Sequence, residues 1–141
     1  MEDNPIAPMT DDEAWEALRS HEFGRLAFHL LDEVHIVPIN YAVDGSHRII
    51  FRTAEGSKLL GVEMNSDVAF EIDQYDDDTA FSVIARGRAT TLEGSAAYIA
   101  DNLPLRPWVP TEKYNVVVIA VSEISGRRFR LEKPWTSIHT R

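Results

Sequence analysis

The chain contains no cysteine among its 141 residues. A disulfide framework, a thiolate metal site and a cysteine nucleophile are therefore excluded. It also has no apolar run long enough to span a bilayer, and its first nine residues lack the basic start and apolar stretch of a secretory signal. These absences predict a cytoplasmic protein that does not act on a membrane.

Basic residues are scarce: 14 Lys and Arg stand against 23 Asp and Glu, which gives a formal net charge of −9. Nucleic-acid binding depends on basic side chains that face phosphates, so this class of function is disfavoured. A local cluster of two or three cations can still hold one small anion. The length suits a single domain, which we expect over residues 10–141 after a flexible tail over residues 1–9.

The N-terminal half begins with a helix signal and then changes to strand periodicity. Thr10 and Glu13 have the spacing of a capping box, so a helix should start here and end between residues 21 and 24. Alternating apolar residues then predict a strand over 23–30. The pair Asp44-Gly45 separates two runs of strand-forming residues and indicates a hairpin between strands over 34–43 and 48–53.

The second half consists mostly of further strand patterns. Gly87 lies inside one of them and is expected to mark a bulge or a close backbone approach. The expected strands cover 68–73, 80–92, 116–121 and 127–131, with short helices over 57–64 and 95–102 and a break at 65–67. This pattern predicts a mainly β fold, a small antiparallel barrel with accessory helices.

The segment 49–60 carries the clearest chemical signal, since a strand turns through Glu55-Gly56 into a helix that begins at Ser57. Free N–H groups in the first turn of a helix attract anions. Arg52, Ser57 and Lys58 add a guanidinium, a hydroxyl and an ammonium, which together could bind one phosphate. The alternative is that Ser57 only caps the helix and both cations are solvated, and the Glu55 carboxylate opposes an anion.

Six short strings in order along the chain resemble the pyridoxamine-5′-phosphate-oxidase-like flavin proteins. The resemblance runs from about Gly24 to Phe129 and so covers most of the chain. It implies a split β-barrel of the FMN-binding type and a homodimer with FMN at the subunit interface. The strings are Gly24–Ala27, Val37–Tyr41, Ile50–Leu59, Val68–Asp73, Phe81–Val83 and Gly126–Phe129.

The resemblance also implies roles for individual residues. The phosphate would be held by Arg52, Ser57 and Lys58, with Leu59 in the same segment. The ribityl chain and ring would be lined by Phe51 and Thr53, and the edge of the isoalloxazine would be contacted by Pro38 and Asn40.

The contacts expected from the partner subunit are less well matched. Many relatives have Gly-Trp-Ser-Val where this chain has Ala80-Phe81-Ser82-Val83, so Phe81 would offer a ring without an indole N–H donor. Trp108 is a second candidate to cover the flavin ring. Arg127 or Arg128 would reach the site from the partner.

No catalytic acid, base or nucleophile can be picked out, and the five scattered histidines lack the spacing of a metal site. The leading hypothesis is an FMN-dependent oxidoreductase that transfers hydride or electrons to a small-molecule substrate. One alternative is a reductase that uses the deazaflavin F420, whose polyglutamate tail suits a basic groove better than this acidic chain. Another is a non-catalytic flavin- or haem-binding protein. Oxidation of pyridoxamine phosphate itself is less favoured, because no residues for a second phosphate are identified.

Overall fold

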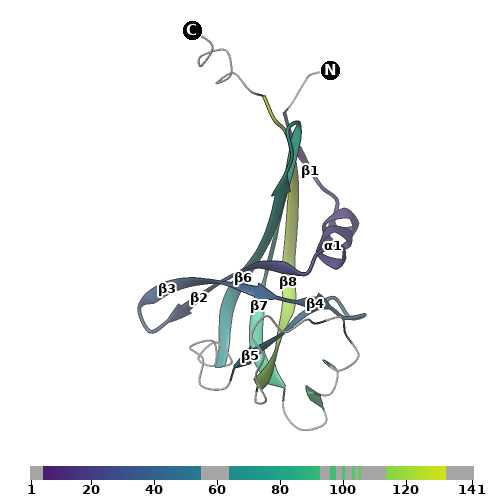
Figure 1. The fold of residues 1–141 in the computed structure, drawn as a ribbon. Helices are drawn as coiled ribbons and strands as arrows, with labels where there is room; N and C mark the ends of the chain where they lie inside the picture. The colour runs from purple at the N-terminus through teal and green to yellow at the C-terminus, as the bar shows by residue number, and fades with distance from the viewer. Residues whose placement is uncertain are drawn as a thin grey trace.

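The computed structural model describes residues 5–54, 64–92, 96, 97, 100, 103, 105 and 114–132. These residues form one α-helix and eight strands that belong to a single antiparallel sheet (Figure 1). The elements are β1 (Ile6–Pro8), α1 (Asp11–Arg19), β2 (Phe23–Leu30), β3 (Glu33–Asn40), β4 (Ala42–Val43), β5 (Arg48–Ala54), β6 (Met64–Tyr75), β7 (Thr79–Leu92) and β8 (Tyr114–Arg130).

The sheet curves into a barrel because its two ends belong to one stretch of chain. Its strand order is β3-β2-β6-β7-β8-β5-β4, and only Tyr41 separates β3 from β4. The Tyr41 side chain is buried, and its hydroxyl donates to the carbonyl of Leu18 at 2.7 Å, at the end of α1. This contact ties the bend in the strand to the helix. The expected mainly β barrel of the split type is confirmed.

The strands β6, β7 and β8 continue past the barrel as a long arm (Figure 1). β2 pairs with β6 only between Val68 and Glu71, whereas β6 and β7 remain paired as far as Tyr75 and Ala80. The short strand β1 joins the tip of the arm by pairing with β8. Residues 6–8 therefore depart from the predicted flexible tail, because the edge of β8 offers them backbone hydrogen-bond partners.

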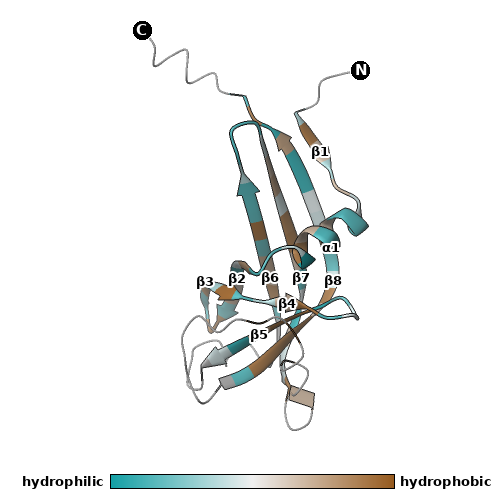
Figure 2. Ribbon diagram, turned by 45° about the vertical axis from the view of Figure 1, so that its right-hand side comes forward, coloured by the Kyte–Doolittle hydropathy of each residue, from teal (hydrophilic) through white to brown (hydrophobic). Residues whose placement is uncertain are grey.

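Apolar side chains fill the barrel, and α1 closes one side of it. Ala14, Trp15 and Leu18 of the helix pack into the main core cluster together with inward-facing residues of the strands. A smaller cluster on the other face of β5 and β8 contains Ile50 and Val116. The first half of β8, which is brown in Figure 2, is buried on both faces over residues 116–119. The apolar run extends to Val121, but Ala120 is exposed.

Several boundaries differ from the sequence prediction. The patterns over 116–121 and 127–131 belong to one strand, β8, because β7 pairs with the polar residues between them. β6 starts at Met64, although a break was expected over 65–67, and a register shift between Met64 and Ser66 accommodates this irregular start. The predicted helix over 57–64 falls almost entirely outside the described residues, as does most of the one over 95–102. In the described part of the chain, no helix is long and apolar enough to cross a membrane.

Candidate flavin site

Arg52 lies on β5, opposite Val116 of β8. It is half-buried, and its Nη2 donates to the main-chain oxygen of Ala100 at 3.3 Å. Its neighbours on this face belong to the smaller apolar cluster, so the guanidinium sits beside a surface of low polarity where an anion would be attracted strongly. The other residues expected at the phosphate, Ser57, Lys58 and Leu59, lie outside the described residues, as does Trp108.

Phe51 and Thr53 face the opposite side of β5, toward the barrel interior. Both are buried, and Phe51 belongs to the main core cluster. This placement follows from the two-residue period of a strand, which puts Arg52 on one face and its two neighbours on the other. A contact between Phe51 and a cofactor would therefore involve the main chain of this residue.

Pro38 and Asn40 share the outward face of β3. Asn40 Nδ2 donates to the carbonyl of Glu22 at 3.1 Å, while its buried Oδ1 has no hydrogen-bond partner among the residues that the structure describes. A buried amide oxygen without a partner is unusual in a native protein. It can accept a hydrogen bond from an N–H group such as the one at the edge of a flavin ring.

The structure also brings Asn40 toward Arg52. β4 pairs with β5 so that Ala42 faces Ile50, and Asn40 precedes Ala42 by two residues as Arg52 follows Ile50 by two. β3 and β5 are indeed in contact. Two of the residues that the sequence assigned to opposite ends of a flavin therefore lie in the same part of the barrel.

Phe81 and Arg127 lie far from this region, on the arm. Phe81 pairs with Arg128, and Ser82 pairs with Arg127, so Phe81 and Arg127 occupy opposite faces of the arm. Twelve residues of β8 separate Val116, which is opposite Arg52, from Arg128. At about 3.3 Å per residue this is roughly 40 Å of strand. Within one chain, Phe81 and Arg127 are therefore not brought to Arg52.

An ionic cluster beside Pro38 was not predicted. Arg25, the cross-strand neighbour of Pro38, donates from Nε and Nη2 to Glu71 Oε1 at 3.0 and 2.6 Å, and Nη2 also contacts the Asp73 carboxylate. Burial, with the hydrogen bond to Asp73, raises the pKa of Glu71, whereas the hydrogen bond from Glu71 lowers the pKa of Asp73. The i, i+2 spacing of the two acids put them on one face of a strand, but the sequence did not reveal their partner.

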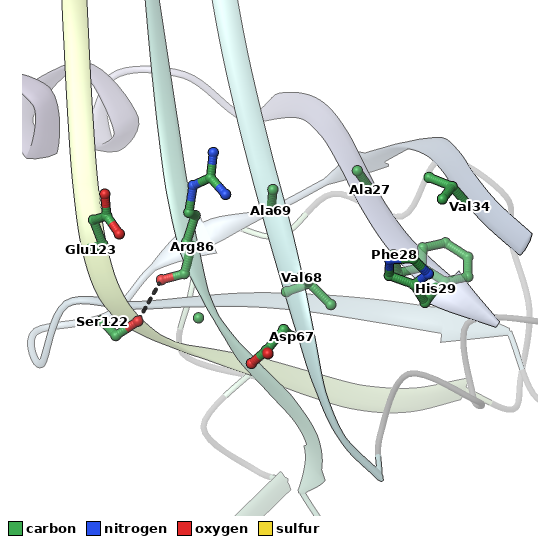
Figure 3. A pocket seen from close by; sticks show the side chains of 11 residues that line it. Ala27, Phe28, His29, Val34, Asp67, Val68, Ala69, Arg86, Ser122 and Glu123 are labelled. Carbon is green, nitrogen blue, oxygen red and sulfur yellow. Dashed lines mark hydrogen bonds between the residues drawn. The ribbon is translucent and has the colours of Figure 1, made fainter. Parts of the chain in front are cut away.

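A shallow hollow of about 430 Å³ lies on the outward face of the sheet (Figure 3). Its floor is a row of short side chains, Ala27 and Ala69, and Arg86 and Glu123 continue the row on the next two strands. Ser122, the extra residue of the bulge in β8, donates from Oγ to the Arg86 carbonyl at 3.2 Å. Among the residues that the structure describes, none of those expected to bind a cofactor lines this hollow.

Comparison with known proteins identifies the family. The family model described as pyridoxamine 5′-phosphate oxidase matches residues 10–128. The chain belongs to this family. An uncharacterised protein of Mycobacterium tuberculosis, Rv0080, is 31% identical over 131 residues, which cover 87% of this chain and 85% of that protein.

Two solved structures extend the family relationship to the whole fold. A Corynebacterium glutamicum protein, provisionally assigned as a pyridoxamine 5′-phosphate oxidase, is 42% identical, with a TM-score of 0.84 over 94% of this chain and 99% of its own. An FAD-binding protein from Mycobacterium smegmatis is 37% identical, with a TM-score of 0.80 over 89% of this chain and 100% of its own. The resemblance recognised from the short strings is confirmed.

Proposed function

We propose that the protein is a flavin-dependent oxidoreductase that binds FMN between two copies of the chain and transfers hydride or electrons to a small molecule. The observation that carries this proposal is the division of the expected flavin contacts. Arg52 and Asn40 belong to the barrel, whereas Phe81 and Arg127 belong to the arm, with roughly 40 Å of strand between the two groups. A second copy can supply one face of its arm, the face with Phe81 and Arg128, to a flavin held by the first.

The residues of the barrel suit such a cofactor. Arg52 offers a guanidinium for a phosphate, and the orphan oxygen of Asn40 offers an acceptor for an N–H at the ring edge. When bound, the flavin would supply the redox chemistry. The protein would hold and orient it. The Arg25–Glu71–Asp73 cluster would keep charged groups at fixed positions next to Pro38.

The candidate cofactors share a phosphate, a ribityl chain and a ring, and they differ in what each adds to them. FAD adds an adenylate to FMN, and the M. smegmatis relative is an FAD-binding protein, so FAD is the second candidate. F420 adds a polyglutamate tail, which a chain of net charge −9 would repel. Titration of the apo-protein with the three cofactors should rank FMN first. Tighter binding of FAD or F420 would reverse this choice.

Removal of the two cations at the expected phosphate site tests the proposal directly. We expect Arg52→Ala combined with Lys58→Ala to abolish flavin retention, because the phosphate loses both of its cationic partners. The measurement is flavin absorbance per protomer after purification, with circular dichroism to verify the fold. Arg19→Ala, which removes an exposed cation from the last turn of α1, is the matched control and should retain flavin.

Unchanged flavin content in the double variant would contradict the assignment of the phosphate site. Turnover is tested separately, by following reduction of the bound flavin with NAD(P)H and its reoxidation by an acceptor. A protein that binds flavin but performs neither step at a useful rate would instead be a carrier or sensor.

A further inference from the structure

A second pocket, of about 380 Å³, lies between α1 and the arm. Met9, Ala17 and Phe81 provide its apolar wall. The rings of Phe81 and His21 meet edge to face, with centroids 5.5 Å apart and planes inclined by 61°. Both rings are half-buried, so their positions are fixed by packing. The wall is suited to an aromatic or aliphatic body of modest size.

The polar groups around this wall are almost all hydrogen-bond acceptors. His21 Nδ1 lies 2.8 Å from the carbonyl oxygen of Ala17, and since a carbonyl only accepts, Nδ1 carries the hydrogen and Nε2 of the neutral ring is an acceptor. The Ser20 hydroxyl donates to the carbonyl of Glu16 at 2.8 Å, which leaves its oxygen as an acceptor. The carboxylates of Asp12 and Glu16 can only accept when they are ionised.

The net charge of the pocket is negative, so it favours the same kind of ligand as the hydrogen-bond acceptors do. Asp12, Glu13 and Glu16 contribute three carboxylates, and Arg128 contributes one guanidinium, which leaves a net charge of −2. Arg128 Nη1 lies 3.4 Å from Glu13 Oε1, so the one cation among the described lining residues already faces an acid. A carboxylate or phosphate ligand would meet repulsion here, whereas a ligand with N–H donors and a positive charge would be attracted.

We propose that this pocket binds a small organic amine: an aromatic or aliphatic body against Phe81 and Met9, with a protonated amino group toward Glu16, Asp12 and His21 Nε2. The proposal that the pocket binds such a ligand does not rest on the proposed function. The use of this ligand as the substrate rests on the proposed function, because Phe81 is also the residue expected to face the flavin ring of a second copy.

Three probes that share a phenyl ring and differ in charge test the ligand class: 2-phenylethylamine, 2-phenylethanol and phenylacetate. Each is titrated into the purified full-length protein, and binding is followed by NMR shifts of α1 and of the arm. We expect the amine to bind at least about tenfold more tightly than phenylacetate, with the alcohol between them. Equal affinities, tighter binding of phenylacetate, or no binding of any probe would overturn the proposal.

Substitutions in the lining test whether the preference for the amine arises in this pocket. Glu16→Gln and Asp12→Asn should each lower the affinity for the amine and reduce the ratio of amine affinity to alcohol affinity. Phe81→Ala should lower the affinities for the amine and the alcohol alike. Asp11→Asn, in the same helical turn but outside the lining, is the control and should leave all affinities unchanged. An amine preference that survives both acid variants would place its binding elsewhere and would also overturn the proposal. Flavin content measured on the same samples separates this result from a failure of the proposed function.

Discussion

Two glycines differ in the space around their α-carbons. A Cβ at Gly87 would lie 2.1 Å from the carbonyl oxygen of Ala120 and 2.9 Å from the Cα of Val121, and backbone atoms cannot easily move aside. A Cβ at Gly45, in the turn before β5, would meet no described atom within 4 Å. Gly87 is therefore required by the close approach of β8 at the bulge.

We expect Gly87→Ala to lower the free energy of unfolding by about 2–4 kcal/mol, because the added methyl group forces the bulged strands apart. Gly45→Ala should change it by less than about 0.5 kcal/mol. Urea unfolding of both variants measures the difference. Similar stabilities for the two would show that the bulge relaxes around the methyl group.

Single residues also show the limits of sequence reasoning. A glycine inside a strand pattern was enough to predict a bulge or a close backbone approach, and the register shift and the nearby Ala120 carbonyl confirm both. The partnership of Arg25 with Glu71 could not be predicted, because it depends on which strands are neighbours and on their register, across 46 residues of sequence. Local pattern contains no information of that kind.

At the scale of elements, α1 and the β4–β5 hairpin follow local rules closely. The predicted capping box is present: Glu13 N donates to Thr10 Oγ1 at 3.1 Å, and Thr10 N donates to Glu13 Oε1 at 2.9 Å. The predicted hairpin is confirmed by the pairing of β4 with β5. β1 was missed because three residues with two prolines nearby give no strand signal without the edge of β8 beside them.

The β4–β5 hairpin depends on one buried carboxylate. Asp44 Oδ1 accepts from the main-chain N–H groups of Ser46 and Arg48, both at 2.9 Å, and Oδ2 accepts from Arg48 Nε at 2.7 Å. Burial alone would raise the pKa of Asp44, but the hydrogen bonds from Arg48 and Ser46 outweigh it and hold the pKa below the ordinary value of 3.8. The ionised form therefore stabilises the turn.

Because the folded-state pKa is depressed, the stability from Asp44 is present above the unfolded-state pKa and is lost as the pH falls through the folded-state pKa. We expect Asp44→Asn to lower the free energy of unfolding at pH 7 by about 1–3 kcal/mol. The deficit should shrink at a pH well below 3.8, where the wild-type carboxyl is also neutral. Urea unfolding across this range measures it, with Asp32→Asn, in an exposed hairpin turn, as the control.

For the whole molecule, the sequence predicted the barrel but not its arm. Alternating patterns and turn residues were enough for the strands, and the ordered strings were enough for the split-barrel family. Sequence patterns mark the ends of strands poorly where a neighbouring strand supplies hydrogen bonds to polar residues, as β7 does along β8. The resemblance assigned Arg52 to the phosphate and expected Phe81 from the partner subunit, and the fold places the first in the barrel and the second on the arm.

Because the expected flavin contacts are divided between barrel and arm, the flavin content of a dimer made from two different variants can be predicted. In a two-fold symmetric dimer, each flavin would contact the barrel of one subunit and the arm of the other. Arg52→Ala/Lys58→Ala and Phe81→Ala/Arg128→Ala homodimers should each retain little flavin, because Phe81 and Arg128 share one face of the arm. A mixed dimer of the two variants has one site with all four residues intact and one site with all four replaced.

Co-expression with two different tags and tandem purification gives the mixed dimer, whose flavin content is read by absorbance. We expect it to bind about one flavin per dimer, or about half the wild-type content, because the intact site draws its barrel from one variant and its arm from the other. If each flavin were held within a single chain, every site in the mixed dimer would carry a defect, and its flavin content would stay as low as that of the two parent variants.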